Sequence, residues 1–240
     1  MNTDWAGIIL ERVTGLTLGA YFQQQIFTPL GISAEDATFF PPPSAQKSHL
    51  ARMHQRDAKT GILHERPHLY HGALSCAPEK QKDFFQSGGA GLWSKPNSFV
   101  KILSILLNSG TAPSTGARIL LPASVDLLFT NQIPNQPNFA RGNPPPVDSS
   151  LLNDAPEIYP QAGDPPQGWG YGGFLTLKEG ETGRGKVTLW WTGFGNCYWW
   201  VDREKGVAGM LAAQLFPDGD EHVVEAWCAA EKGVYDGLGA

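Results

Sequence analysis

The sequence predicts an α/β protein of the α+β kind, with its helices and its antiparallel sheet in separate layers. Apolar residues recur at helical spacing in the first 30 residues and again around residues 97–107. From Trp169 onward, short strand-like runs alternate with glycine-containing turns, and a last helical segment follows near residues 221–234. Helices first, then an antiparallel meander closed by a helix, favour two segregated layers.

The composition describes one globular domain. The chain has 240 residues, 41% of them hydrophobic, and a formal net charge of −5. A chain of this length can bury a sizeable core without disulfides or a metal ion. The acidic balance gives no electrostatic reason to bind nucleic acid, and no apolar run is long enough to cross a bilayer. Three widely spaced cysteines and no visible secretory signal favour a cytoplasmic location.

The region up to residue 168 is predicted to hold helices and loops. Asp4–Thr14 is expected to form a helix that ends at Gly15, and a second helix is expected between Thr17 and Pro29. The other predicted elements are a hairpin around residues 58–61, a glycine-rich turn at 87–92, helices at 97–107 and 122–131, and a surface loop at 134–168.

Four strands are predicted in the region 169–240, ahead of its terminal helix. They lie at residues 171–178, 186–192, 197–202 and 207–215. Only the short Arg203–Gly206 segment connects the last two strands, so these are expected to pair antiparallel.

Three segments carry a resemblance to a known family. They are Asp4–Gly15 together with Phe27–Ile32, then Ser87–Ser94, and then Trp191–Gln214. In this order they resemble serine β-lactamase-related proteins, and in particular fungal acyltransferases of the lovastatin transesterase type and bacterial β-lactamase-like esterases. The three matches span nearly the whole chain, so the resemblance implies a β-lactamase/transpeptidase-like fold.

The resemblance also implies a chemistry. Members of the family attack an ester or thioester with a serine activated by a Ser-x-x-Lys pair and a tyrosine, and they form an acyl-enzyme without a cofactor. Trp191, Thr192 and Gly193 match the third motif of the family, and the N–H of Phe194 is the expected oxyanion donor. The implied partner is a small-molecule acyl ester or thioester, free or bound to a carrier protein.

The catalytic serine, lysine and tyrosine of the family have no counterpart at the expected places. The resemblance implies a tyrosine about five residues before Asp4, which is upstream of Met1, and a Ser-x-x-Lys pair roughly a hundred residues further upstream. The chain is therefore expected to be the C-terminal part of the domain, truncated at its N-terminal side and inactive alone. The alternative is a non-catalytic remnant or ligand-binding protein that keeps the apolar cleft. Either way, the last strand should have a free apolar edge, and Trp5 and Leu10 should be partly uncovered.

Two segments repeat the Ser-x-x-Lys pattern elsewhere. Ser44–Lys47 follows three prolines, which exclude a helix immediately before the serine. Ser98–Lys101 lies at a predicted helix N-terminus, where Ser98 is interpreted as a cap or an exposed residue. Neither pair is expected to supply a nucleophile.

Tryptophans are concentrated in the predicted strands. Trp169, Trp191 and Trp199 are candidates for lining an apolar acyl pocket beside the third motif. Alternation sends only about half of the strand tryptophans to one face, so core packing is the competing interpretation for each one except Trp191.

Three histidines form the only candidate metal cluster. His64 and His68 have the spacing of two ligands on one helix face, and His71 follows closely. Pro67 breaks such a helix and no further ligand completes the set, so no metal site is predicted.

Overall fold

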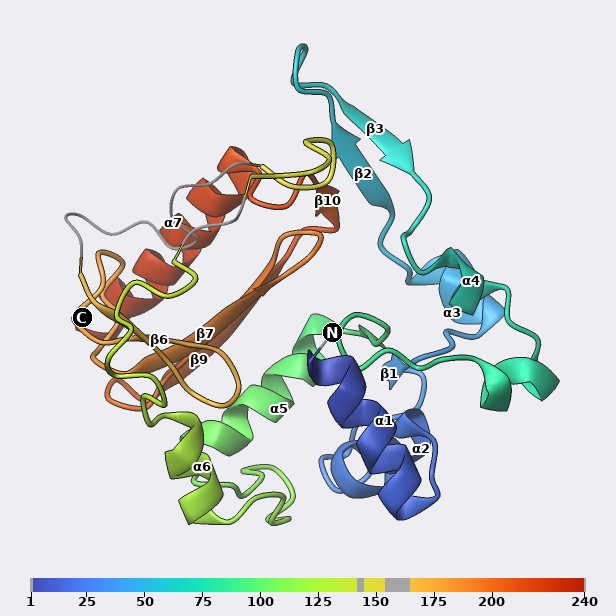
Figure 1. Ribbon diagram of the computed structural model, residues 1–240, viewed down its shortest axis with the longest axis horizontal. Coiled ribbons are helices and arrows are strands. Elements are labelled where there is room, and N and C mark those ends of the chain that lie inside the picture. The colour runs from blue at the N-terminus through green and yellow to red at the C-terminus, as the bar shows by residue number, and fades with distance from the viewer. Residues whose placement is uncertain (1, 142–144, 154–164, 240) are drawn as a thin grey trace.

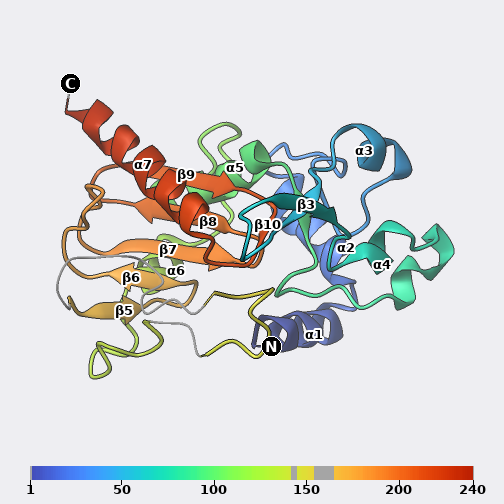
Figure 2. The same ribbon diagram turned by 90° about the horizontal axis from the view of Figure 1, so that it is seen from above.

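The computed structural model describes residues 2–141, 145–153 and 165–239 (Figure 1). A five-stranded antiparallel sheet lies between α7 (Glu221–Leu238) on one face and α5 (Pro96–Leu107) on the other. Its strands follow one another in sequence order, and Figure 2 shows α7 running across them. They are β5 (Gln167–Trp169), β6 (Phe174–Thr176), β7 (Thr188–Gly193), β8 (Cys197–Asp202) and β9 (Val207–Ala212).

The register between β7 and β8 decides which tryptophans are buried. Trp190 pairs with Trp200, and Trp191 pairs with Trp199. Because side chains alternate between faces, the first pair packs against Trp227 of α7 and is buried. The second pair is only partly buried. The predicted division of the tryptophans between two faces is thus confirmed.

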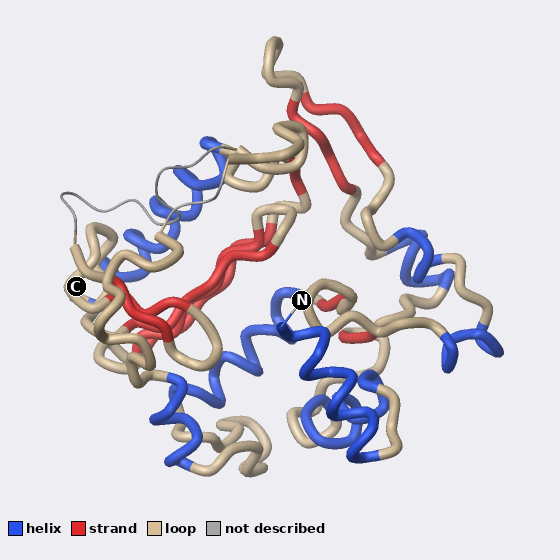
Figure 3. The backbone as a smooth tube through the Cα atoms, viewed as in Figure 1, coloured by secondary structure: helices blue, strands red, loops and turns tan. Residues whose placement is uncertain are grey.

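The remaining elements lie outside the central sheet, and most are short segments joined by loops (Figure 3). α1 (Asn2–Thr14) is followed by α2 (Leu18–Phe22), which continues into a π-helical turn at Gln23–Phe27. Thr17 caps α2 by accepting a hydrogen bond from Ala20 N. The others are β1 (Ala37–Thr38), α3 (Pro43–Ser48), β2 (Met53–Arg56), β3 (Leu63–Arg66), α4 (His71–Leu74), a 3₁₀ turn (Pro78–Asp83), β4 (Trp93–Ser94), α6 (Pro122–Leu128) and β10 (Leu215–Phe216).

The structure confirms two predicted hairpins and corrects the bounds of one predicted strand. β2 pairs antiparallel with β3 around the predicted turn, and β8 pairs antiparallel with β9. The strand predicted at 207–215 ends at Ala212, however, and Leu215–Phe216 pairs in parallel with β2 in a second sheet. The break lies at Gln214, whose φ of 54° is incompatible with an extended strand. The predicted loop at 134–168 lies partly outside the described residues, and β5 begins at Gln167.

An apolar face of α1 is exposed. Trp5, Ile9 and Val13 recur every four residues, which places them on one side of the helix, and Trp5 is 63% exposed. Leu10 is half-buried. β9 has a single strand neighbour among the described strands, so its other edge is unpaired in this part of the chain. Both features agree with the expected uncovered surface.

A buried ion pair joins α7 to the loop before β7. The side chains of Arg184 and Glu231 are both fully buried, and Arg184 donates to both carboxylate oxygens of Glu231. Thr182 donates its hydroxyl to the same carboxylate at 2.7 Å. The guanidinium also lies 5.0 Å from the ring centroid of Trp190. Such a bidentate pair holds the helix in one position on the sheet.

Glu231→Ala is expected to lower the free energy of unfolding by about 3–5 kcal/mol, because Arg184 would keep a buried charge without its carboxylate. Lys232→Ala is the matched control, since it removes only the exposed pair with Asp236 and should cost less than about 0.5 kcal/mol. Urea unfolding of both variants measures the difference. Equal losses of unfolding free energy in the two variants would show that the buried pair contributes no more to stability than the exposed pair.

Candidate active-site wall

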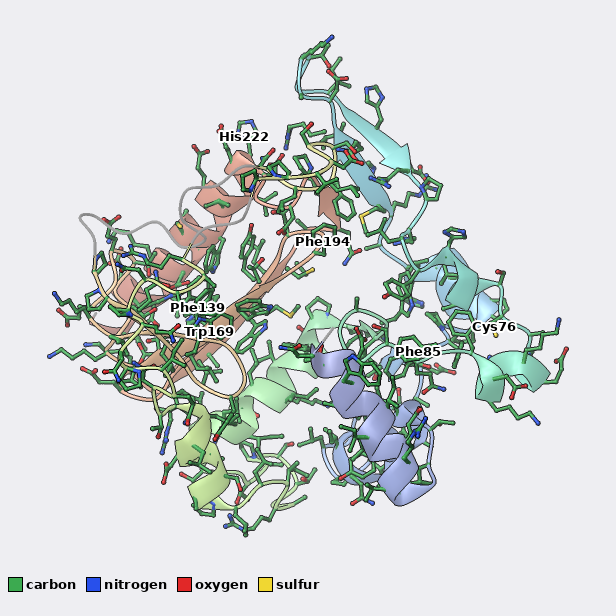
Figure 4. The ribbon with its side chains drawn as sticks, viewed as in Figure 1. Cys76, Phe85, Phe139, Trp169, Phe194 and His222 are labelled. Atoms are coloured by element: carbon green, nitrogen blue, oxygen red, sulfur yellow. The ribbon has the colours of Figure 1, made fainter. Side chains whose placement is uncertain are left out.

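The third-motif residues lie at one end of the central sheet. Trp191, Thr192 and Gly193 are the last residues of β7, and Phe194 begins the turn that leads to β8. Figure 4 shows Phe194 at the tip of this hairpin. Its ring is half exposed and meets the ring of Phe216 edge-on at 5.2 Å between centroids. The structure therefore places Phe194, the residue of the predicted oxyanion donor, at the surface.

The main-chain N–H of Phe194 is available for a ligand. The β7–β8 ladder ends at the pair Gly193 and Cys197, so Phe194 lies beyond the last paired residues. No hydrogen bond connects its N–H to another residue in the part of the chain that the structure describes. An N–H that projects from a rigid turn can stabilise negative charge that develops on a carbonyl oxygen.

The predicted acyl-pocket residues divide into two groups. Trp169 and Trp191 lie together, with ring centroids 5.1 Å apart, and both contact Phe174. The indole N–H of Trp169 donates to the Phe139 carbonyl at 3.4 Å, and Figure 4 shows these two residues side by side. Trp199 packs instead against the cluster formed by α5, α6 and the sheet. Trp169 and Trp191 thus form one aromatic wall, and Trp199 pairs with Trp191 on the neighbouring strand.

Asn196 was not predicted, although it lies within the turn. Its side chain is fully buried and makes five hydrogen bonds. The amide donates to Leu215 O at 2.8 Å and Pro217 O at 2.7 Å. Its oxygen accepts from the hydroxyl of Tyr198 at 2.8 Å, and from Gly219 N at 2.9 Å and Asp220 N at 3.2 Å. The only sequence signal was a Gly-Asn pair in a turn, which indicates backbone shape and not these partners.

Asp218 is a second polar residue that sequence reasoning missed. It is nearly buried, and its Oδ1 has no hydrogen-bond partner among the described residues. Burial raises the pKa of this carboxyl to about 6, although backbone N–H groups of Asn196 and Gly219 favour the charged form. Its charge also helps to raise the pKa of the Tyr198 hydroxyl, for which burial is the larger cause. The segment behind the third-motif turn therefore contains a carboxyl that titrates near neutral pH.

The structure corrects what the sequence predicted for the serines of the two Ser-x-x-Lys segments. Ser98 was interpreted as a cap or an exposed residue, and both interpretations are wrong: it is buried, and Lys95 is the N-cap. The helix begins at Pro96, so Ser98 falls inside the first turn and faces the core. Lys101 donates to Gly31 O at 3.2 Å. The prediction that the prolines exclude a helix immediately before Ser44 is wrong: α3 begins at Pro43, because proline fits the first position of a helix, and Ser44 is an exposed residue of its first turn.

The three histidines belong to separate elements. His64 lies on β3 and His71 begins α4. His68 packs edge-on against Trp93 at 4.8 Å between centroids, and burial lowers its pKa. Among the described residues, no three histidine, cysteine, aspartate or glutamate side chains are grouped as metal ligands would be. Likewise, no described helix combines the length and apolar character needed to span a bilayer.

Comparison with known proteins identifies the family. The Beta-lactamase family model matches residues 1–233. The chain belongs to the β-lactamase family. It is 34% identical over 228 residues to the lovastatin esterase of Penicillium rubens, a match that covers 90% of this chain and 50% of the esterase. It is 30% identical over 225 residues to the monacolin J acid methylbutanoyltransferase of Aspergillus terreus, covering 91% and 49% of the two chains.

A solved structure of a simvastatin synthase mutant from Aspergillus terreus is similar throughout the chain. The TM-score is 0.72 at 27% sequence identity, and the match covers 98% of this chain and 53% of the synthase. The chain thus spans about half the length of the relatives it matches. The predicted family and its fold, with helices and an antiparallel sheet, are confirmed.

Asp218→Asn is expected to change how stability depends on pH. Because the pKa of Asp218 rises from 3.8 to about 6 on folding, the folded state holds the proton more tightly, and stability falls as pH rises from about 4 to about 6. The variant should therefore be more stable than the wild type at pH 7, by on the order of 3 kcal/mol, and this gain should vanish near pH 4. Urea unfolding across this range measures it.

Asp148→Asn is the control. Hydrogen bonds from Ser150 lower the pKa of Asp148, so its ionised form favours folding and its replacement should bring no gain at neutral pH. A pH-independent difference between Asp218→Asn and the wild type would contradict the assignment.

Proposed function

We propose that this chain forms the oxyanion-binding wall of a serine acyltransferase or esterase that acts on small acyl esters or thioesters. The observation that carries the proposal is the Phe194 N–H, which lies at the exposed tip of the hairpin without a partner among the described residues. In acyl transfer, attack on the carbonyl places negative charge on its oxygen, and a fixed N–H donor lowers the energy of that state. The activities for which the relatives are named, esterase and methylbutanoyltransferase, support this chemistry.

The aromatic wall is proposed to hold the acyl group. Trp191 lies on β7, three positions before Phe194, and Trp169 contacts it from β5. Together they offer apolar faces beside the oxyanion donor, and Trp199 supports them from β8. The proposed partner is a small-molecule ester or thioester, free or on a carrier protein, and the proposed location is the cytoplasm.

Residues 1–240 are proposed to act as one partial domain. In this arrangement the helical and loop region 1–168 supports the sheet and terminal helix of region 169–240, because α5 packs against β8 and β9. The exposed face of α1 and the open edge of β9 are the surfaces on which further polypeptide of the same domain would pack.

The nucleophile is proposed to lie outside these 240 residues. Ser98 is buried, and the amine of Lys101 donates to a main-chain carbonyl, so the pair lacks the contact that activates a serine. The same facts keep open the alternative of a ligand-binding protein that retains the cleft without turnover.

Incubation with a fluorophosphonate probe, followed by intact-mass measurement, tests the missing nucleophile. No labelling of the 240-residue chain is expected, because the nucleophile is proposed to lie outside it. The control is trypsin, which the probe must label under the same conditions. A stoichiometric adduct on Ser98 or another serine would disprove the proposal.

Titration with a small acyl thioester, S-methyl 2-methylbutanethioate, tests the pocket. Binding is expected to quench tryptophan fluorescence, and Trp191→Ala should weaken it about tenfold through loss of apolar contact. Trp5→Ala is the control, because Trp5 is exposed on α1 and should leave the affinity unchanged. Equal affinities of wild type and Trp191→Ala would exclude Trp191 from the site.

A further inference from the structure

The turn that carries Phe194 has an unusual backbone. It contains Gly195 with φ 96° and Asn196 with φ 59°, two successive residues in the left-handed region. Asparagine tolerates this region better than most residues, and glycine tolerates it freely. Backbone preference alone therefore accepts either residue at position 196 and does not explain a fully buried asparagine side chain there.

The side-chain amide of Asn196 has four of its five partners on one segment, residues 215–220. Both amide protons go to carbonyls of the chain just after β9, those of Leu215 and Pro217. The amide oxygen accepts from two N–H groups at the start of α7, those of Gly219 and Asp220. Because carbonyls surround one end of the amide and donors the other, its orientation is determined by its neighbours.

The main chain strengthens the same connection. Leu215 N donates to Gly195 O at 3.1 Å, and Ala213 N donates to Asn196 O at 3.2 Å. Asp220 in turn forms an ion pair with Arg56 of β2 at 2.5 Å. The turn is thus attached to β10, to the N-terminus of α7 and, through Asp220, to the β2–β3 hairpin.

These contacts determine where Phe194 lies. The peptide unit that carries the Phe194 N–H begins at Gly193, the last residue of the β7–β8 ladder, so the ladder restrains this unit from one side only. The first restraint after Phe194 is the one at Gly195 and Asn196. We propose that Asn196 is a positioning residue: its buried amide holds the Phe194 N–H in the orientation that an acyl carbonyl oxygen requires. The claim that Asn196 serves catalysis rests on the proposed function. The claim that it orders the turn can be tested on the protein without a ligand.

Asn196→Gly is the decisive variant, because it keeps the left-handed backbone and removes all five side-chain bonds. Asn153→Ala is the matched control: Asn153 donates to Gly219 O of the same segment at 2.9 Å but does not touch the turn. In ¹⁵N relaxation, the order parameters of Phe194 and Gly195 should be about 0.85 in wild type and control, and below about 0.6 in Asn196→Gly. A turn that stays rigid in Asn196→Gly would overturn the proposal.

A second measurement separates positioning from a merely structural role. Titration of ¹⁵N-labelled wild type with S-methyl 2-methylbutanethioate should move the Phe194 amide signal downfield, together with the Trp169 and Trp191 indole signals. In Asn196→Gly the indole signals should still move and the Phe194 response should be lost. A Phe194 response of equal size in both proteins would overturn the proposal.

If no indole signal moves in either protein, the proposed function fails, and the relaxation result alone decides whether Asn196 orders the turn. If Asn196→Gly does not fold, exchange of the Asn196 side-chain amide protons in the wild type decides instead. Slow exchange, comparable to that of core amides, is expected from five bonds in a buried site. Fast exchange would overturn the proposal.

Discussion

The buried amide of Asn196 is the interaction on which this end of the molecule depends. A hairpin turn normally needs only its own ladder, yet this one is attached to a segment that follows it by about twenty residues in the sequence. The cost of burying a polar amide is offset because every donor and acceptor has a partner. As a result the exposed end of β7, the N-terminus of α7 and β10 form one rigid unit.

A second polar cluster holds the other end of α7. Glu231 binds Arg184, and the hydroxyl of Tyr235 donates to the buried carboxylate of Asp202 at 2.9 Å. Asp202 also accepts from Gly185 N at 2.6 Å, which ties the loop before β7 to the end of β8. Between the two clusters, the indole of Trp227 packs on Tyr198 and Trp190. The helix is therefore restrained by directional bonds at both ends and by apolar packing in the middle. These contacts hold α7 in a constant position on the sheet whose strand β7 carries the third motif.

The open surfaces and the site have a common physical cause. The central sheet ends at β9 and the exposed stripe of α1 begins at Trp5, while relatives of about twice this length share the fold. Apolar side chains at helical spacing are stable in water only when other polypeptide covers them, which agrees with the proposal that further polypeptide of the same domain packs on these surfaces. The same proposal puts the nucleophile outside this chain and leaves it the proposed oxyanion donor at Phe194.

The sequence alone determined the order and type of the main elements, because helical periodicity, strand alternation and turn residues act over a few neighbouring positions. It also placed Trp191–Phe194 at a strand end, and this agrees with the structure. Only the tertiary structure decided that Ser98 is buried, that Gln214 breaks the last strand, and that Asn196 and Asp218 lie behind the turn. Their partners are distant in the sequence, so no local pattern could reveal which side chains would lose water and which carbonyls would receive their hydrogen bonds.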